Sequence, residues 1–338
     1  MKRATNEFGV TVAVGRNVFS WCPRVSIIIP AYNVAEYICE TLDSVKEQKF
    51  RDYEIILVND GSPDTKQFEH AIRTHMQDIV YVRSPSRGAG AARNLGIKYA
   101  RADILAFLDA DDVWLPDYLS AQIAFLGRGR DMVYSDAALF GTKSAYRRTF
   151  MDDAPSEGEV TAASLLDYRC NVITSGTVAT KNAVLAVGGF EKERARAHDF
   201  HLWVRMAKNH ARISYQKKVL LKYRVRTDNL SGDSISRVER EIDVLNRVRD
   251  TITLTGDELA IIDRKLEVLE TNLQIERGKS FLIQKDFLHA REAFAEANRR
   301  QPSLKLAAVA FAAKLAPNLL LSHFRSRRAD EVGMLRSS

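Results

Sequence analysis

Residues 104–112 read ILAFLDADD, an apolar run that leads directly into a cluster of carboxylates. An apolar run of this length, bounded by polar residues, is typical of a buried strand. Similar runs occur at 25–29, 53–58, 79–82 and 131–134, and helical patterns occur at 36–48, 89–100 and 116–126. Farther along the chain, strands are predicted at 172–179 and 219–225, and a short helix at 162–166. Strands that alternate with helices indicate an α/β fold with a mostly parallel sheet.

Acidic residues stand at the ends of two of these predicted strands. Asp60 follows the run 53–58, and Asp109 and Asp111 follow the run 104–108. In an open α/β sheet, ligands bind outside the carboxyl ends of the strands, so we expect both acidic sites to open on to one crevice. Asp is also a common turn residue, and either site alone has a purely structural interpretation.

The segment 109–112 places three carboxylates within four residues. Carboxylates packed this closely raise one another's pKa unless a cation neutralises them. A divalent cation that bridges to a diphosphate suits this pattern. An EF-hand calcium loop does not, because Val113 and Trp114 occupy positions that need an oxygen ligand and a glycine. The alternative is an Asp-rich helix start, which Pro116 supports.

Two further segments carry candidate functional residues. Residues 88–93 (GAGAAR) imitate a dinucleotide-binding fingerprint, but Arg93 replaces its third glycine. We interpret the segment as a helix start that brings Arg93 near an anionic ligand, with an ordinary glycine-rich turn as the alternative. Asp199 precedes a partly apolar helix, where it is either a general base or a helix cap. His198 and His201 lack a third strong ligand, which disfavours zinc.

The composition is that of a packed globular protein. The chain has 338 residues, 46% hydrophobic and 28% charged, and no apolar run reaches the ~18 residues of a membrane-spanning helix. Its three cysteines lack metal-site spacing and cannot form a closed set of disulfides. The N-terminus is a poor signal peptide. We therefore expect a cytoplasmic protein.

Charge and apolar residues gather at the C-terminal end. The net charge is +7, and residues 297–329 contain seven basic residues and no acidic one. The rest of the chain is balanced, which argues against a nucleic-acid-binding protein. The segment 304–324 is apolar and is split by Pro317 into two predicted helices. We hypothesise that 304–328 lies on an anionic membrane surface, at the inner face of the membrane; the alternative is a helix packed on the N-terminal part of the chain.

The chain is predicted to be nearly all helical from Ser236 onward. Within this region, residues 278–302 resemble one helix pair of the tetratricopeptide type. The side chains predicted to face inward are Phe281, Phe287, Ala290, Phe294 and Ala297. One pair is too few for a stacked array, which needs about three repeats.

Seven motifs, in their order and spacing, resemble the family 2 glycosyltransferases, which adopt the GT-A fold. They are 25–33 (VSIIIPAYN), 58–62 (VNDGS), 90–96 (GAARNLG), 107–112 (FLDADD), 188–190 (GGF), 198–205 (HDFHLWVR) and 223–226 (YRVR). The resemblance covers about residues 24–228. It implies a GT-A domain there, an N-terminal arm at 1–23 and a helical region with a basic amphipathic tail at 229–338.

The resemblance implies an inverting transfer of a sugar from a nucleotide-sugar to a hydroxyl of a saccharide or lipid-linked acceptor, in surface polysaccharide or glycolipid synthesis. By the family pattern, the expected donor is a UDP-sugar. By the family's motifs, Pro30, Ala31, Tyr32, Asp60 and Arg93 bind the nucleotide, Asp109 faces the ribose or the metal, Asp111 holds Mg²⁺ or Mn²⁺, and Asp199 is the general base. Arg226 stands where the family often has His, so we expect it to contact phosphate directly.

Two other functions remain open at this point. A nucleotidyltransferase also uses a nucleotide crevice and metal-binding carboxylates, but it usually begins with a glycine-rich basic loop, whereas residues 30–33 are PAYN. A nucleotide-sugar-binding protein without catalytic activity is disfavoured by the joint presence of Asp60, Asp109, Asp111 and Asp199.

Overall fold

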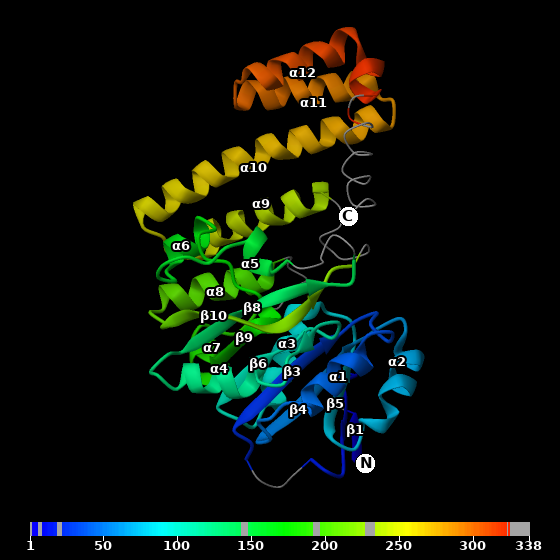
Figure 1. Cartoon of the computed structure of the whole chain (residues 1–338), viewed down its shortest axis with the longest axis vertical. Coiled ribbons are helices and arrows are strands. Elements are labelled where there is room, and N and C mark those ends of the chain that lie inside the picture. Colours follow the sequence, from blue (N-terminus) through cyan, green and yellow to red (C-terminus); the bar gives the residue numbers. More distant parts are fainter. Residues whose placement is uncertain are drawn as a thin grey trace. The chain divides into compact units, whose positions relative to one another are not determined.

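The computed structural model describes residues 2–5, 9–18, 22–142, 148–191, 197–226, 234–322 and 324. The chain forms two compact units. The first comprises Met1–Gly141 and Ala145–Val225, and the second comprises Thr142–Ser144 and Arg226–Ser338. Figure 1 shows the elements of each unit.

A mixed sheet lies at the centre of the first unit (Figure 1). Its strand order is β1-β2-β5-β4-β3-β6-β9-β8-β10-β7. The strands are β1 Lys2–Thr5, β2 Thr11–Val14, β3 Val25–Ala31, β4 Tyr53–Asp60, β5 Ile79–Ser84, β6 Ile104–Phe107, β7 Val113–Trp114, β8 Met132–Phe140, β9 Thr177–Thr180 and β10 Ile213–Arg224. The neighbours β5, β4, β3 and β6 run parallel, as do β8 and β10. The predicted α/β fold class is confirmed, and the carboxyl ends of β3, β4 and β6 share one edge.

Helices connect these strands. They are α1 Ile38–Lys46, α2 Thr65–Ala71, α3 Ala89–Tyr99, α4 Tyr118–Leu126, α5 Phe150–Asp153, α6 Ala162–Leu166, α7 Lys181–Ala186 and α8 His198–Lys208, with the 3₁₀ turns η1 Ile72–Thr74 and η3 Thr174–Gly176. Helix α3 packs against β3 and β4. A Cβ on Gly96 would lie 2.6 Å from Ile28 Cγ2, so only glycine lets α3 approach β3 this closely.

Several strands extend beyond their predicted ends. β3 continues through Pro30, which is tolerated because the ladder with β6 ends at Ile28 and needs no N–H beyond it. β4 includes Asp60 as its last residue, whereas the sequence places Asp60 after the strand. β10 starts at Ile213, six residues before the predicted strand 219–225, and its register shifts twice. The predicted strand 172–179 is instead η3 followed by β9.

The short strands β1, β2 and β7 were not predicted. β2 pairs antiparallel with β5, from Thr11 opposite Arg83 to Val14 opposite Val80, so part of the 1–23 segment extends the sheet. Strands of two to four residues give too little alternation for a pattern to reveal them.

The second unit is helical, with α9 Ser234–Thr251, α10 Gly256–Ile283, α11 Phe287–Arg300 and α12 Leu304–Leu315. A further helix at 317–322 begins at Pro317, as predicted. The residues predicted to face inward in 278–302 do so: Ala290, Phe294 and Ala297 are buried, and Phe281 and Phe287 pack against the same core. Within the described ranges, none of the helices has the length and apolar character needed to cross a bilayer.

Candidate active site

Three carboxylates follow β6 and differ in their surroundings. Asp112 is buried, whereas Asp109 and Asp111 are partly exposed. Asp112 Oδ2 accepts a hydrogen bond from Ser175 Oγ at 2.5 Å, and Oδ1 accepts one from the backbone N–H of Arg224 at 2.8 Å. Burial, and then the charges of Asp111 and Asp109, raise the pKa of Asp112 well above its ordinary value. Asp112 is therefore an internal structural group, and the other two carboxylates reach the surface.

Arg224, at the end of β10, fixes this acidic loop. Its Nε donates to the backbone carbonyl of Asp111 at 2.8 Å, and its guanidinium pairs with Glu40 of α1. The guanidinium carbon also lies 4.7 Å from the ring centre of Tyr37 and 4.3 Å from that of Phe140. Arg224 appears in the sequence only as part of the motif at 223–226, and this role was not predicted, because nothing in the sequence shows which groups a guanidinium contacts.

Arg93 connects the acidic loop with α8. Its side chain is buried, and its guanidinium donates to the Asp109 carboxylate and contacts His198 Nε2. The His198 ring also lies against the first turn of α3, because a Cβ on Gly90 would lie 3.1 Å from its Cγ.

Asp199 lies in the first turn of α8, which starts at His198 with Ala197 as its N-cap. The helix-cap interpretation of Asp199 is therefore wrong. Its Oδ2 accepts a hydrogen bond from Thr174 Oγ1 at 2.8 Å, and its Oδ1 accepts one from the backbone N–H of Phe200 at 2.9 Å. Burial alone would raise the pKa of Asp199, but positive charge on His198 and Arg93, together with these hydrogen bonds, lowers it. The carboxylate is thus ionised at neutral pH.

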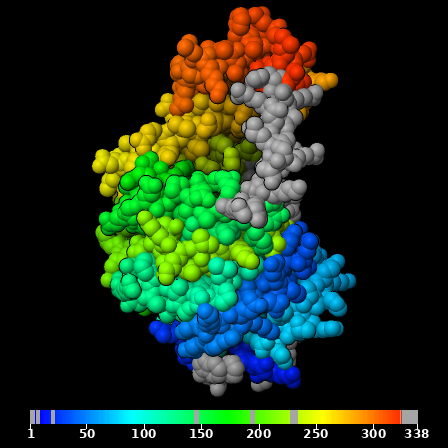
Figure 2. All heavy atoms as spheres, in the orientation of Figure 1, coloured from blue at the N-terminus to red at the C-terminus, as the bar shows by residue number. Residues whose placement is uncertain are grey.

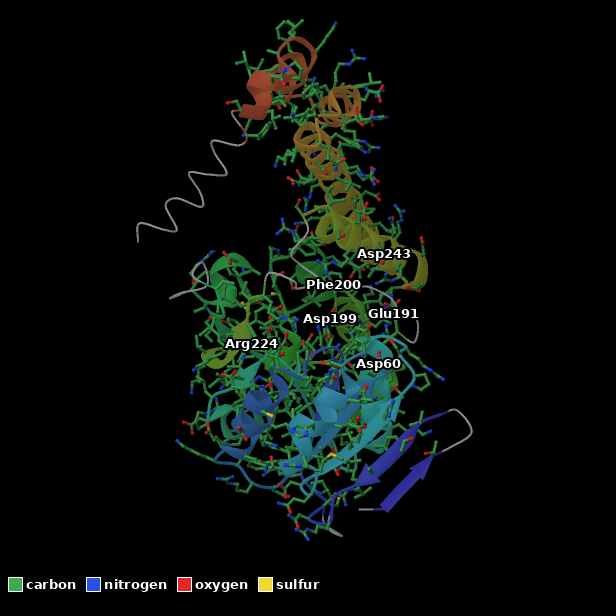
Figure 3. All side chains as sticks on the ribbon, turned by 90° about the vertical axis from the view of Figure 1, so that its right-hand side faces the viewer. Asp60, Glu191, Asp199, Phe200, Arg224 and Asp243 are labelled. Carbon is green, nitrogen blue, oxygen red and sulfur yellow. The ribbon has the colours of Figure 1, made fainter. Side chains whose placement is uncertain are left out.

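Thr174 and Ser175 connect these acidic groups, because Thr174 Oγ1 donates to Asp199, while Ser175 Oγ donates to Asp112 and accepts from the N–H of Asp109. Tyr223, next to Arg224 on β10, is affected by all of them. Its pKa is raised by burial and then by the charges of Asp112, Asp109, Asp111 and Asp199. Carboxylates from two stretches of chain that are about 90 residues apart in the sequence therefore raise the pKa of the same phenol. Figure 3 labels Asp199 and Arg224 among the side chains of this unit.

Asp60 fixes the loop that starts α3. It is buried at the end of β4, its Oδ1 accepts a hydrogen bond from the N–H of Arg87 at 2.9 Å, and its Oδ2 accepts one from the N–H of Gly88 at 2.8 Å. Gly88 is the N-cap of α3, and its φ of 95° favours glycine. The helix start predicted at 88–93 is present, and Asp60, labelled in Figure 3, holds the turn before the helix that carries Arg93.

The remaining predicted donor residues lie at two places. Pro30 and Ala31 end β3, and Tyr32 directly after them is 55% exposed. The N–H of Asn33 donates to Ser62 Oγ at 2.7 Å, which joins the loop after β3 to the loop after β4. Arg226 belongs to the second unit, so its predicted contact with phosphate stays a prediction.

The carboxylates of Asp109 and Asp111 could bind a divalent metal ion together with the oxygens of a bound diphosphate. Within the described ranges, no group of three His, Cys, Asp or Glu side chains is arranged to enclose a metal ion. Mg²⁺ is commonly bound by only one or two carboxylates plus substrate phosphates. Two partly exposed carboxylates are consistent with that mode of binding, and with a cation that arrives together with the donor.

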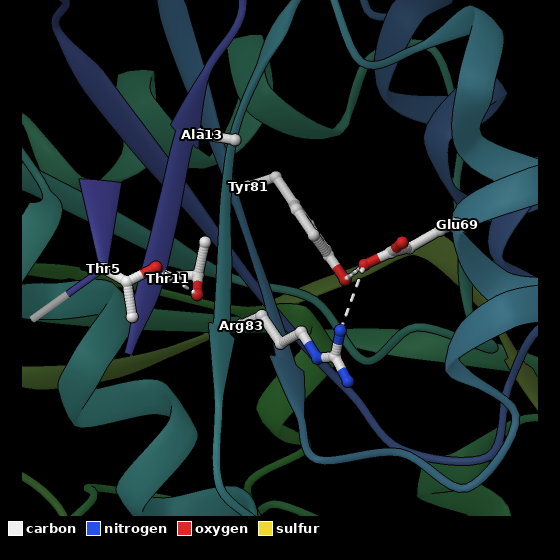
Figure 4. A pocket seen from close by; sticks show the side chains of 6 residues that line it. All are labelled: Thr5, Thr11, Ala13, Glu69, Tyr81 and Arg83. Carbon is white, nitrogen blue, oxygen red and sulfur yellow. Dashed lines mark hydrogen bonds and ion pairs between the residues drawn. The ribbon is translucent and has the colours of Figure 1, made fainter. Parts of the chain in front are cut away.

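Two cavities lie beside β2 and β5. One, of about 310 Å³, is lined by Thr5, Thr11, Ala13, Glu69, Tyr81 and Arg83 (Figure 4). The other, of about 320 Å³, is lined by Gly9, Thr11, Gly61, Arg83, Ser84 and Pro85. Ser84 Oγ lies 3.5 Å from Asp60 Oδ1, so the second cavity adjoins one of the predicted nucleotide-binding residues. None of the predicted metal or catalytic residues lines either cavity.

Comparison with known sequences agrees with this arrangement. Residues 26–169 match the family described as Glycosyl transferase family 2. The chain is 30% identical over 233 residues to an uncharacterized glycosyltransferase of Rickettsia prowazekii, which covers 68% of this chain and 72% of the relative. It is 25% identical to the UDP-Glc:alpha-D-GlcNAc-diphosphoundecaprenol beta-1,3-glucosyltransferase of Escherichia coli, over 65% of this chain and 85% of the relative. A 29% identical glycosyltransferase of Rickettsia felis is longer, and the chain spans 38% of it.

Solved structures share the fold. A mannosyltransferase of Pyrobaculum calidifontis, in complex with GDP-Man and Mn²⁺, aligns with a TM-score of 0.59 and 20% identity, over 94% of this chain and 86% of that one. The ordered motifs, the sequence matches and the shared architecture together show that the chain belongs to family 2 of the glycosyltransferases and has the GT-A fold.

Proposed function

We propose that the protein is an inverting, metal-dependent transferase that moves a sugar from a UDP-sugar to a hydroxyl of a saccharide or lipid-linked acceptor. One observation carries the proposal: two adjacent residues, Thr174 and Ser175, hold the base and the acidic loop together. Thr174 Oγ1 donates to the Asp199 carboxylate at 2.8 Å, and Ser175 Oγ accepts a hydrogen bond from the N–H of Asp109 at 3.1 Å. A base and a set of acidic metal ligands are the two components that this reaction needs.

In the proposed reaction, Asp199 accepts the proton of the acceptor hydroxyl. The acceptor oxygen then forms a bond to the anomeric carbon, while the bond from that carbon to the diphosphate breaks with its electron pair. Both Asp199 oxygens already accept one hydrogen bond each, from Thr174 and Phe200. These bonds hold the carboxylate in one orientation and leave lone pairs for the incoming proton.

The leaving diphosphate needs positive charge beside it. When bound, Mg²⁺ or Mn²⁺ supplies Lewis-acid stabilisation of that charge, and Asp111 with Asp109 would hold the ion. Arg93 pairs with Asp109 and adds a permanent positive charge. We assign Arg226 to the phosphates, and Pro30, Ala31, Tyr32 and Asp60 to the nucleoside.

A binding screen and one variant test this function. A thermal-shift series of UDP-, GDP- and dTDP-sugars, with and without Mn²⁺, should raise the melting temperature most for a UDP-sugar with Mn²⁺, because a ligand of the native state stabilises it. A UDP-linked donor is supported by the name of the Escherichia coli relative, whereas the Pyrobaculum structure holds GDP-Man. Asp199→Asn should keep donor binding and lose transfer. Transfer at the wild-type rate by this variant would refute the base assignment.

We also propose where the reaction takes place. The Escherichia coli relative is named for a diphosphoundecaprenol-linked acceptor, which supports a lipid-linked acceptor and a role in surface polysaccharide or glycolipid synthesis. The GT-A domain at 24–228 would act in the cytoplasm, at the inner face of the membrane. The helical region at 229–338 would attach it there through 304–328, of which 323 and 325–328 lie outside the described residues.

A further inference from the structure

The last helices of the second unit carry apolar side chains on two opposite faces. The inner face contributes Val309, Ala310, Ala313, Leu320 and Leu321 to a core that contains Phe294. On the outer face the exposed fractions are 94% for Leu304, 64% for Phe311, 63% for Leu315 and 74% for Leu319. Figure 2 shows this orange to red region at the molecular surface. A helix whose only task is to cover a core has a polar outer face, which α12 lacks.

The exposed apolar residues of α12 form one stripe. At about 100° per residue, Leu304, Ala308, Phe311 and Leu315 fall within about 60° of one another around the helix axis. Lys305 and Lys314 lie about 90° to either side of the middle of this stripe. We call these six residues the α12 outer face.

The charged side chains of the segment that contains the α12 outer face have one sign. Neither Lys305 nor Lys314 forms an ion pair with any residue that the structure describes, and both are exposed. Residues 297–329 contain no acidic side chain. An apolar stripe with a lysine on each side matches the boundary of an anionic bilayer, where the apolar side chains enter the acyl region and the ammonium groups reach the lipid phosphates.

We propose that the α12 outer face lies in the surface of a membrane that contains anionic lipids. This proposal rests on the membrane location proposed above and names the residues that would attach the protein there. It does not depend on the catalytic assignments. A second copy of the chain fits less well. In a two-fold contact each partner presents the same surface, so the lysines beside both stripes would face one another without a counter-charge.

Vesicle flotation of the full chain tests the proposal. We expect the wild-type protein to float with vesicles of phosphatidylcholine and phosphatidylglycerol in equal parts, to float poorly with phosphatidylcholine alone, and to be released by added NaCl. Phe311→Glu combined with Leu315→Glu should lower the partition coefficient about tenfold or more, because two apolar contacts are replaced by repelled charges. Lys305→Gln with Lys314→Gln should weaken binding to the anionic vesicles and leave the remaining binding less sensitive to salt.

Leu288→Glu is the matched control. Leu288 lies on α11 of the same unit and is 55% exposed, but it does not belong to the stripe. This variant should float as the wild type does. Sedimentation velocity and thermal melting accompany every variant, and all should keep the wild-type mass and melting temperature. The proposal is overturned if the wild type does not float, if the Glu pair floats normally, or if the Glu pair converts a dimer into a monomer. Each of these results is independent of the transferase assay.

Discussion

The ion pair between Arg93 and Asp109 allows a quantitative test, with Arg93→Met as the perturbation. Methionine fills the buried space but removes the guanidinium that donates to Asp109 and contacts His198. Hydrogen bonds to charged groups contribute about 1.5–3 kcal/mol each. The Asp109 side chain is 34% exposed, so water partly replaces its lost partner. We therefore expect Arg93→Met to lower the free energy of unfolding by about 2–4 kcal/mol.

Differential scanning fluorimetry measures this loss as a melting temperature. The first unit contains about 220 residues, and for that size each kcal/mol shifts the melting temperature by about 2–4 °C, so the expected decrease is about 5–15 °C. Donor binding should weaken as well, since Arg93 supplies positive charge beside Asp109. Arg128→Met, at an exposed arginine, is the control and should melt as the wild type does. An Arg93→Met protein with unchanged melting temperature and donor affinity would refute the connecting role of Arg93.

Three further predictions concern charge and packing. The pKa of Asp112 is raised, so ionisation of this group lowers the free energy of unfolding of the wild type as the pH rises above about 4. Asp112→Asn lacks this loss. Its free energy of unfolding, measured in urea without added metal, should therefore increase relative to the wild type between about pH 4 and 7. The pKa of Asp199 is lowered, so the stabilisation by this carboxylate is present above about pH 4 and is lost only as the pH falls through the lowered pKa. Titration of its carboxyl ¹³C resonance should therefore have a midpoint below about pH 4. A higher midpoint would contradict the assigned environment. Gly278→Ala should lower the free energy of unfolding by about 1–3 kcal/mol, measured by thermal melts followed by circular dichroism, because its Cβ would lie 2.7 Å from Phe294. Gly256→Ala in the same helix is the control. Its Cβ would meet nothing within 4 Å, so this variant should be neutral or slightly stabilising.

Much of the fold could be predicted from local sequence. The central strands are buried on both faces and therefore read as continuous apolar runs, and helices α3 and α6 begin and end within one residue of their predicted bounds. Strand β10 was predicted too short, because only its second half is apolar and parallel pairing with β8 extends it. Tertiary pairing of this kind overrides local pattern.

The candidate site was predictable as a set of residue types but not as a set of contacts. Asp60, Asp109 and Asp199 stand out because acidic residues follow apolar strands or precede a helix. Nothing in the sequence shows that Asp112 is buried, that Thr174 orients Asp199, or that His198 contacts Arg93. These contacts join residues more than 20 positions apart, and only the three-dimensional structure brings them together.

A crystal structure with UDP and Mn²⁺ tests the central claim most directly. The claim is that the leaving diphosphate and the base meet at one site. We predict an anomalous manganese peak beside Asp111, coordinated by the diphosphate, with the Asp199 carboxylate opening into the same cavity. A manganese ion and diphosphate bound elsewhere on the protein, or an Asp199 carboxylate closed off from them, would contradict it.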